Sequence, residues 1–162
     1  MTVKRPLAFI LSALPALLCM VLIFAFSAQT ADTSSATSGS LIERILSLLP
    51  SGFDSMSAAR QTELVESLQF FVRKGAHFTV YALLGMLCLQ PAYVLVHRVP
   101  RAAFWSWCAT ALYAVTDEIH QYFVPGRSCE VRDMLIDAIG AALGILCLAG
   151  IVCLIRRRKK TK

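Results

Sequence analysis

Long apolar stretches alternate with short polar segments along this chain of 162 residues. Four stretches are long enough to cross a bilayer as helices, which takes about 20 apolar residues each. They cover residues 7–31, 76–96, 102–123 and 134–155, and the first contains no charged residue. The pattern therefore predicts an all-α, polytopic membrane protein with four transmembrane helices, folded as a single domain over residues 1–162.

The first apolar stretch also fits a second interpretation, a cleaved secretory signal peptide. Ser27, Ala28 and Ala31 are small enough to form a cleavage site. The apolar part is longer than the roughly 7–15 residues that such signals use. We therefore expect a retained membrane span.

The polar segment between the first two spans, residues 32–75, is expected to lie outside the membrane. Its opening run, residues 30–40, is rich in serine and threonine and is predicted to be flexible. Residues 40–49 fit a short amphipathic helix, with Ser40 and Glu43 spaced as a capping box. This helix is expected to lie on the membrane surface or to bind a partner. The end of the segment is expected to begin a helix that continues into the second span.

Charge gives the predicted orientation. Hydrophobic residues make up 57% of the chain and the net charge is +6. Such a charge can indicate nucleic-acid binding, but the closing string RRRKKTK directly follows an apolar run, which is typical of the cytoplasmic end of a span. Four spans place this tail on the same side as Lys4 and Arg5 and as Arg98 and Arg101. We therefore expect both termini in the cytoplasm and no nucleic-acid partner.

The six cysteines do not suggest disulfide or metal chemistry. No Cys-x-x-Cys spacing occurs, and all of them except Cys129 lie in apolar spans. The sequence therefore predicts no disulfide framework and no zinc site.

Polar residues gather at the outer ends of the spans. Asp117, His120 and Gln121 follow i, i+3, i+4 spacing and share one helix face, whereas Glu118 points about 100° away. The same level is expected to hold Gln29, Arg73, Lys74, His77, Tyr81, Arg127, Arg132, Asp133 and Asp137. Ionisable groups at this depth are expected to face the bundle interior or a water-filled pocket. The sequence thus predicts an outward-facing polar pocket, although structural salt bridges and interfacial anchors are the alternative roles.

Gly140 and Gly144 form a GxxxG pattern in the last span. This pattern marks close helix packing, either within the bundle or in a homodimer.

Several strings resemble the VanZ-like family of bacterial membrane proteins. They are RKGAHFTVYALLG (73–85), DEIHQYFVPGRS (117–128) and DMLIDAIGAALG (133–144), with FSAQ (26–29) at the end of the first span. The matching motif positions are Ser27, Gln29, Arg73, Lys74, His77, Tyr81, Asp117, Glu118, His120, Gln121, Pro125, Gly126, Arg127, Asp133, Asp137 and Gly140. One departure is Cys129, which stands where the family commonly has glycine.

The resemblance implies a bacterial cell-membrane location and a role in resistance to teicoplanin, a lipid-tailed glycopeptide. It implies no settled biochemical activity. Our first hypothesis is a binding protein whose basic residues grip a phosphate head group: Arg73, Lys74, Arg127 and Arg132. The ligand would be a membrane lipid, a lipid-linked wall precursor or the lipoglycopeptide itself.

The second hypothesis is an enzyme acting on a lipid head group. Its acid and base candidates are Asp117, Glu118, His120, Asp133 and Asp137. A divalent cation is a possible cofactor, but the sequence requires none because no metalloenzyme signature is present. A transporter and a purely structural membrane partner are further alternatives.

Overall fold

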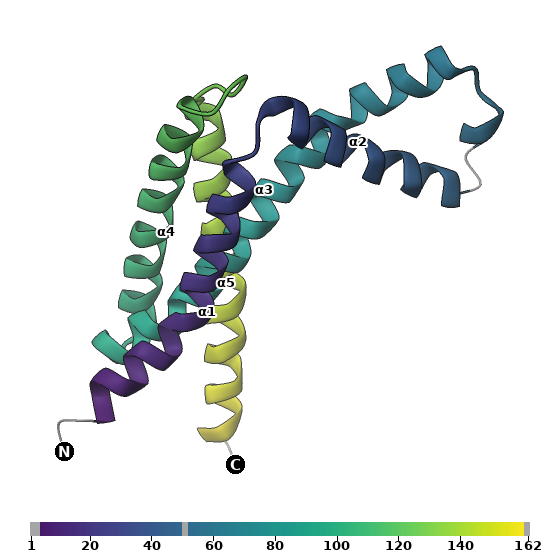
Figure 1. Ribbon diagram of the computed structural model, residues 1–162. Coiled ribbons are helices and arrows are strands. Elements are labelled where there is room, and N and C mark those ends of the chain that lie inside the picture. Colours follow the sequence, from purple (N-terminus) through teal and green to yellow (C-terminus); the bar gives the residue numbers. More distant parts are fainter. Residues whose placement is uncertain (1–3, 50–51, 161–162) are drawn as a thin grey trace.

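The computed structural model describes residues 4–49 and 52–160 and is all-α, as predicted. Its elements are α1 (Lys4–Ser27), α2 (Ala31–Leu48), the short 3-10 helix η1 (Phe53–Ser55), α3 (Ala58–Val96), α4 (Val99–Tyr122) and α5 (Val131–Lys160). Helices α1, α4 and α5 form an elongated bundle with the second half of α3 (Figure 1). Helix α2 and the first half of α3 form an arm that projects from one end of this bundle (Figure 1).

Three of the described helices are long and apolar enough to cross a membrane. Their spanning segments are Arg5–Ser27, Ala58–Val96 and Val131–Arg156. Helix α4, the third of the four predicted spans, has the length but a less apolar sequence, because Ser106, Thr110 and two acids interrupt it. Those side chains are buried against the neighbouring helices. The described residues therefore support a multi-pass membrane protein.

Exposed apolar side chains cover the outside of the bundle. Leu11, Leu18 and Val21 of α1 and Leu146 and Leu154 of α5 are all more than half exposed. A soluble protein rarely leaves so large an apolar surface in contact with water. The surface is therefore suited to contact with lipid.

Helices α3 and α5 approach each other unusually closely. A Cβ atom added at Gly140 would collide with the carbonyl oxygen of Phe78, and one added at Gly144 would collide with that of Ala82. On the α3 side, a Cβ atom at Gly85 would lie 2.8 Å from the carbonyl oxygen of Ala141. The GxxxG stripe therefore packs inside the chain. This is the first of the two roles that the sequence allowed for the stripe, and the homodimer stays a prediction.

The arm differs from its prediction. Residues 30–40, which were expected to be flexible, are helical from Ala31 onward, because α2 already begins there. Thr30 caps this helix, and its Oγ1 accepts a hydrogen bond from the Thr33 amide at 3.3 Å. Ser40 lies inside this helix and donates to the Thr37 carbonyl at 3.0 Å, so the predicted capping box is wrong. Serine and threonine fit here because their hydroxyls can bond back to the preceding turn.

The arm has a small apolar core of its own. Ile42 of α2, Phe53 of η1 and Val65 of α3 are buried together. Gln69 ties the two helices further, because its side-chain amide donates to the Ser35 carbonyl at 3.2 Å. As predicted, the end of this polar segment begins a helix that runs into the second span without a break.

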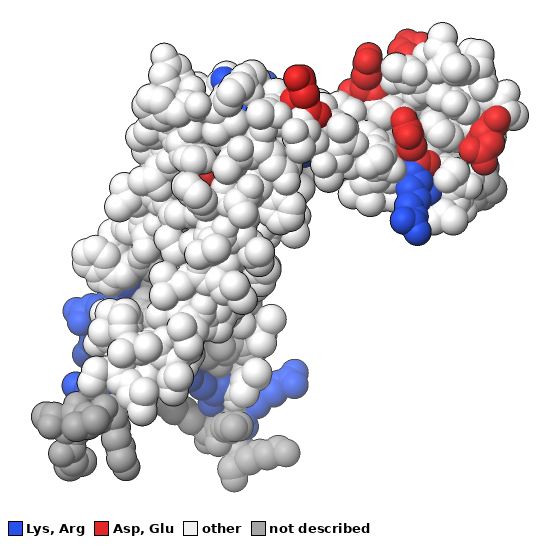
Figure 2. All heavy atoms as spheres, in the orientation of Figure 1, with Lys and Arg blue, Asp and Glu red and all other residues white. Residues whose placement is uncertain are grey.

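Basic side chains mark the opposite end of the molecule from the arm. Described arginine side chains lie where α1 begins and α5 ends, and the bundle between the two ends is almost free of charged surface in this view (Figure 2). Arg98 and Arg101 lie at the start of α4, at this same end (Figure 1). The structure therefore groups the basic segments as the sequence predicted, while their cytoplasmic location stays a prediction.

The close approach of α3 and α5 gives a direct test. Gly144→Ala is expected to lower the free energy of unfolding by roughly 1–3 kcal/mol, because the added methyl group overpacks the interface. Gly150→Ala in the same helix is the matched control, since a Cβ atom there meets no atom within 4 Å. Equilibrium unfolding in mixed micelles, followed by circular dichroism, measures both variants. Equal stability of the two variants would contradict the packing described here.

Candidate functional site

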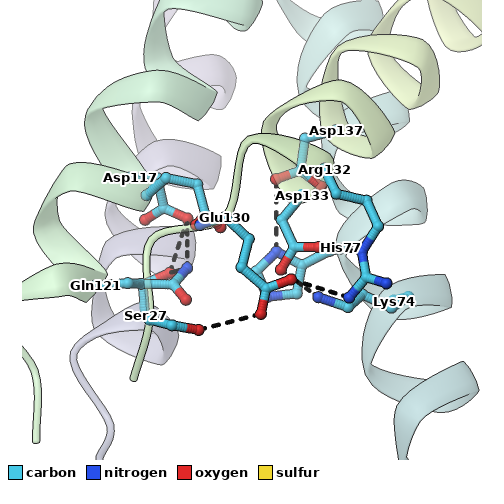
Figure 3. Close-up of polar contacts among 11 residues, drawn as sticks. Ser27, Lys74, His77, Asp117, Gln121, Glu130, Arg132, Asp133 and Asp137 are labelled. Carbon is cyan, nitrogen blue, oxygen red and sulfur yellow. Dashed lines mark hydrogen bonds and ion pairs between the residues drawn. The ribbon is translucent and has the colours of Figure 1, made fainter. Parts of the chain in front are cut away.

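A buried hydrogen-bond network joins α1 to α4. The Asp117 carboxylate, 3% exposed, accepts bonds at Oδ2 from Ser27 Oγ at 3.0 Å and from Gln121 Nε2 at 3.1 Å (Figure 3). Gln121 also donates to Ser27 Oγ at 3.3 Å. Asp117 and Gln121 share a helix face, as their spacing predicted. The network therefore positions the end of α1 against the outer part of α4.

Glu118 points away from this network and toward the loop that leads into α5. Its side chain is 1% exposed, and Oε2 accepts the Glu130 amide at 3.0 Å. A carboxylate buried in an apolar bundle is costly unless it is hydrogen-bonded. Glu118 thus holds the start of α5 close to the end of α4.

Two acid–base pairs connect α3 to α5, one helical turn apart. Lys74 forms an ion pair with Asp133. One turn further along, His77 Nδ1 lies 3.6 Å from Oδ2 of the fully buried Asp137 (Figure 3). The two aspartates are spaced i, i+4 and the lysine and histidine i, i+3, so each helix presents its two side chains on one face.

The turn after α4 packs on the junction between α1 and α2. The Ala31 amide donates to the Pro125 carbonyl at 3.2 Å, and Arg127 Nε donates to the Gln29 carbonyl at 3.2 Å. Gly126 has a φ of 74° in this turn, and an added Cβ atom would lie 2.9 Å from the Ala31 Cβ. Only glycine meets both conditions without strain.

These elements enclose a pocket of about 260 Å³ at the end of the bundle where the arm begins. Its lining residues are Ala31, Phe70, Arg73, Lys74, Gln121, Gly126, Arg127, Ser128, Glu130, Arg132 and Asp133. Glu130 lies between the α1–α4 network and the α3–α5 pairs (Figure 3). Four of the lining side chains are cationic, and we call this pocket the basic pocket. It lies closer to the arm than the buried acids of the bundle.

Two of the four cations lack an acidic partner. The Arg73 side chain makes no hydrogen bond or ion pair with any residue in the described ranges 4–49 and 52–160, and the Arg127 side chain bonds only the neutral Gln29 carbonyl there. Burial and the positive charge of Arg73 both lower the pKa of Arg127, while the Asp117 and Glu118 carboxylates raise it. Two guanidinium groups that line one pocket and form no ion pair favour a bound anion.

The other two cations are held in place. Arg132 Nη2 lies 2.9 Å from Glu130 Oε2, and Lys74 is paired with Asp133. Both also lie over the Phe70 ring, with Lys74 Nζ at 5.7 Å and Arg132 Cζ at 5.3 Å from its centroid. Cations at this distance are attracted to an aromatic face. Phe70 thus fixes one wall of the pocket.

The structure brings together only part of the predicted site. The predicted residues that line the basic pocket are Arg73, Lys74, Gln121, Arg127, Arg132 and Asp133. Those buried among the helices are Tyr81, Asp117, Glu118 and Asp137, with His77 partly exposed beside them. Tyr81 has 0% exposure, and its hydroxyl has no hydrogen-bond partner in the described part of the chain.

Two predicted residues play a different part. His120 packs against Phe24, with ring centroids 4.3 Å apart, and does not line the pocket. Gln29 contributes its backbone carbonyl to Arg127. Phe70 and Glu130 also line the pocket, and neither was predicted from the sequence. The available signals were positions in the sequence: Phe70 lies three residues before Arg73, and Glu130 lies between Arg127 and Arg132.

The buried acids do not form a metal centre in the described ranges. Among those residues, no group of three or more His, Cys, Asp or Glu side chains is arranged to hold a metal ion.

An all-α membrane protein with a basic pocket above buried acids is the class that this fold and site define. The VanZ/LLP1 family model matches residues 12–155. The chain therefore belongs to the VanZ/LLP1 family, and the resemblance seen in the sequence is confirmed. Searches of curated proteins and of solved structures find no match.

Proposed function

We propose that the protein binds the anionic head group of an envelope lipid, or of a lipid-linked wall precursor, in the basic pocket. The observation that carries the proposal is the pair of half-buried guanidinium groups, Arg73 and Arg127, that lack an acidic partner in the described chain. Arginine pairs well with phosphate oxygens because its planar fork donates two hydrogen bonds.

The position of the pocket suits a ligand that is anchored in a bilayer. Phe70 is 46% exposed and Phe71 is 70% exposed, so apolar surface continues from the pocket onto the outside of α3. An acyl chain would lie along this apolar surface while its head group enters the pocket. In this proposal α4 also crosses the membrane, which gives four spans in total. The basic end of the bundle faces the cytoplasm, so that the pocket opens on the outer side.

Lipid retention tests this function. Arg127→Glu is expected to reduce the anionic lipid that copurifies with the protein by roughly tenfold, because it removes charge-assisted hydrogen bonds worth about 1.5–3 kcal/mol. Lipid extraction followed by mass spectrometry of the detergent-purified protein gives the measurement.

Arg101→Glu is the matched control, since Arg101 is exposed at the start of α4, at the opposite end of the bundle. Its retained lipid should equal that of the wild type. Equal retention by both variants and the wild type would refute the basic pocket as a lipid site.

We also propose that this binding underlies protection against teicoplanin. The lipoglycopeptide carries an acyl tail, so it and an envelope lipid would use the same membrane surface. Vancomycin lacks that tail and serves as the comparison drug. The buried Asp117 network supports the proposal because it holds α1 and α4 beneath the pocket.

A susceptibility assay tests this role in a host that lacks the protein. Wild type is expected to raise the inhibitory concentration of teicoplanin and to leave that of vancomycin unchanged. Asp117→Asn and Arg127→Gln are expected to lose the protection at equal membrane levels, because the first removes a buried charge and the second a pocket cation. Full protection by both variants would contradict the proposal and would leave these charges with a structural role alone.

A membrane-embedded enzyme is the second candidate function, and the His77–Asp137 pair favours it. Asp137 is fully buried, whereas the His77 side chain is 30% exposed, so the carboxylate can orient the ring while part of the ring stays accessible. A positioned imidazole can transfer protons during the hydrolysis of a phosphate ester. Water would then cleave the ester bond and release inorganic phosphate from the lipid alcohol.

Phosphate release tests the enzymatic candidate. Purified wild type in vesicles that contain phosphatidic acid is expected to release inorganic phosphate, and His77→Ala is expected to release none because proton transfer is lost. Arg101→Gln is the control and should keep the wild-type rate. The absence of release by the wild type would exclude this reaction on that lipid.

A further inference from the structure

The basic pocket has a defined surplus of positive charge. Four of its lining residues are cationic, Arg73, Lys74, Arg127 and Arg132, and two are acidic, Glu130 and Asp133. Among these lining side chains, four positive and two negative charges leave a surplus of two. The buried Asp117 and Glu118 carboxylates also act on Arg127, but they do not line the pocket and accept hydrogen bonds from within the bundle and from the Glu130 amide. Because the pocket is partly enclosed by protein, charges in it are screened less than charges in open solvent.

The two acids neutralise particular cations. Asp133 is paired with Lys74, and Glu130 is paired with Arg132 at 2.9 Å. Phe70 lies against both of these cations and restrains them. The surplus of two positive charges therefore lies on the two lining arginines that have no acidic partner.

The two arginines without an acidic partner belong to different elements of the chain. Arg73 comes from α3, and Arg127 comes from the turn that follows α4. Hydrogen-bonding through its Nε to the Gln29 carbonyl fixes Arg127, and its terminal nitrogens make no hydrogen bond within the described chain. Two guanidinium groups from different elements can bind different oxygens of one phosphate.

We infer that the basic pocket selects a head group with two negative charges, of which a terminal phosphate monoester is the smallest, over a singly charged phosphodiester. The inference rests on the proposed lipid-binding function and names the ligand class of that site. A monoester balances both free guanidinium groups, whereas a phosphodiester leaves one positive charge unbalanced in a confined pocket. The acids at the other wall repel an anion and direct it toward Arg73 and Arg127.

The charge of the ligand makes this selectivity depend on pH. A phosphate monoester loses its second proton at a pKa of about 6, whereas a phosphodiester keeps a single negative charge across the neutral range. The preference for the monoester should therefore grow as the pH rises through that value. A purely structural role of the two arginines would not produce such a profile.

The test compares two lipids that differ in head-group charge. Full-length protein is placed in nanodiscs of phosphatidylcholine, and displacement of a fluorescent phosphatidic acid is measured with unlabelled phosphatidic acid or phosphatidylglycerol. At a pH above the second phosphate pKa, phosphatidic acid is expected to compete roughly tenfold better than phosphatidylglycerol, because it forms one additional charge-assisted pair. Arg73→Gln and Arg127→Gln should each remove most of this difference, and Arg101→Gln should retain it.

The results separate this inference from the function on which it rests. Equal competition by the two lipids, with weaker binding in both pocket variants, would overturn the selectivity and leave lipid binding intact. Binding of phosphatidic acid that neither variant weakens would overturn both. Inorganic phosphate is a third competitor, and displacement by phosphate as strong as that by phosphatidic acid would show that the site takes a free anion instead of a lipid.

Discussion

Carboxylates inside an apolar bundle must find partners within the chain, and this constraint organises the half of the bundle that is nearest the arm. A buried charge without a partner costs several kcal/mol, so the position of each acid determines which segment must approach it. Asp117 requires the hydroxyl of Ser27 and the amide of Gln121, which brings α1 to α4. Asp133 requires Lys74, which joins α5 to α3.

The pocket follows from the same constraint. The bonds of Asp117, Glu118 and Asp133 join the helix ends, and the turn containing Gly126 packs against Ala31. Arg127 and Arg73 then line the same pocket, and the side chain of neither is paired with an acid in the described chain. Unbalanced positive charge is thus a consequence of how the acids beneath it are satisfied, and it gives the site its chemical character.

Much of this arrangement could be predicted from residue spacing. The shared face of Asp117 and Gln121 and the separate direction of Glu118 follow from helical periodicity. Spacing also placed Lys74, His77, Asp133 and Asp137 at one level, but it did not identify which of them pair. Periodicity gave no distances between helices, so it did not separate the lining residues from the buried ones. The contact of His120 with Phe24 of α1 could not be predicted, because the two residues lie far apart in the sequence.

The arm was predicted least well because composition misleads there. A run of serine and threonine suggests a flexible loop, but its hydroxyls bond to the preceding turn and Ile42 packs against Val65, so a helix forms. Likewise, the GxxxG pattern indicated close packing but not its partner. Whether such a stripe faces another helix of the same chain or a second copy depends on how the chain folds back, which spacing alone does not define.

Helix α3 also makes the arm and the pocket mechanically continuous. Its 39 residues correspond to about 58 Å of helix, and Arg73 and Lys74 lie near the middle of that length. The half before them belongs to the arm, and the half after them is packed in the bundle. One continuous helix therefore joins the arm to the bundle, and the two basic residues lie near the place where the helix leaves the bundle. Lateral pressure or crowding at the membrane surface that displaces the arm would be transmitted through a stiff rod to the place where the pocket opens.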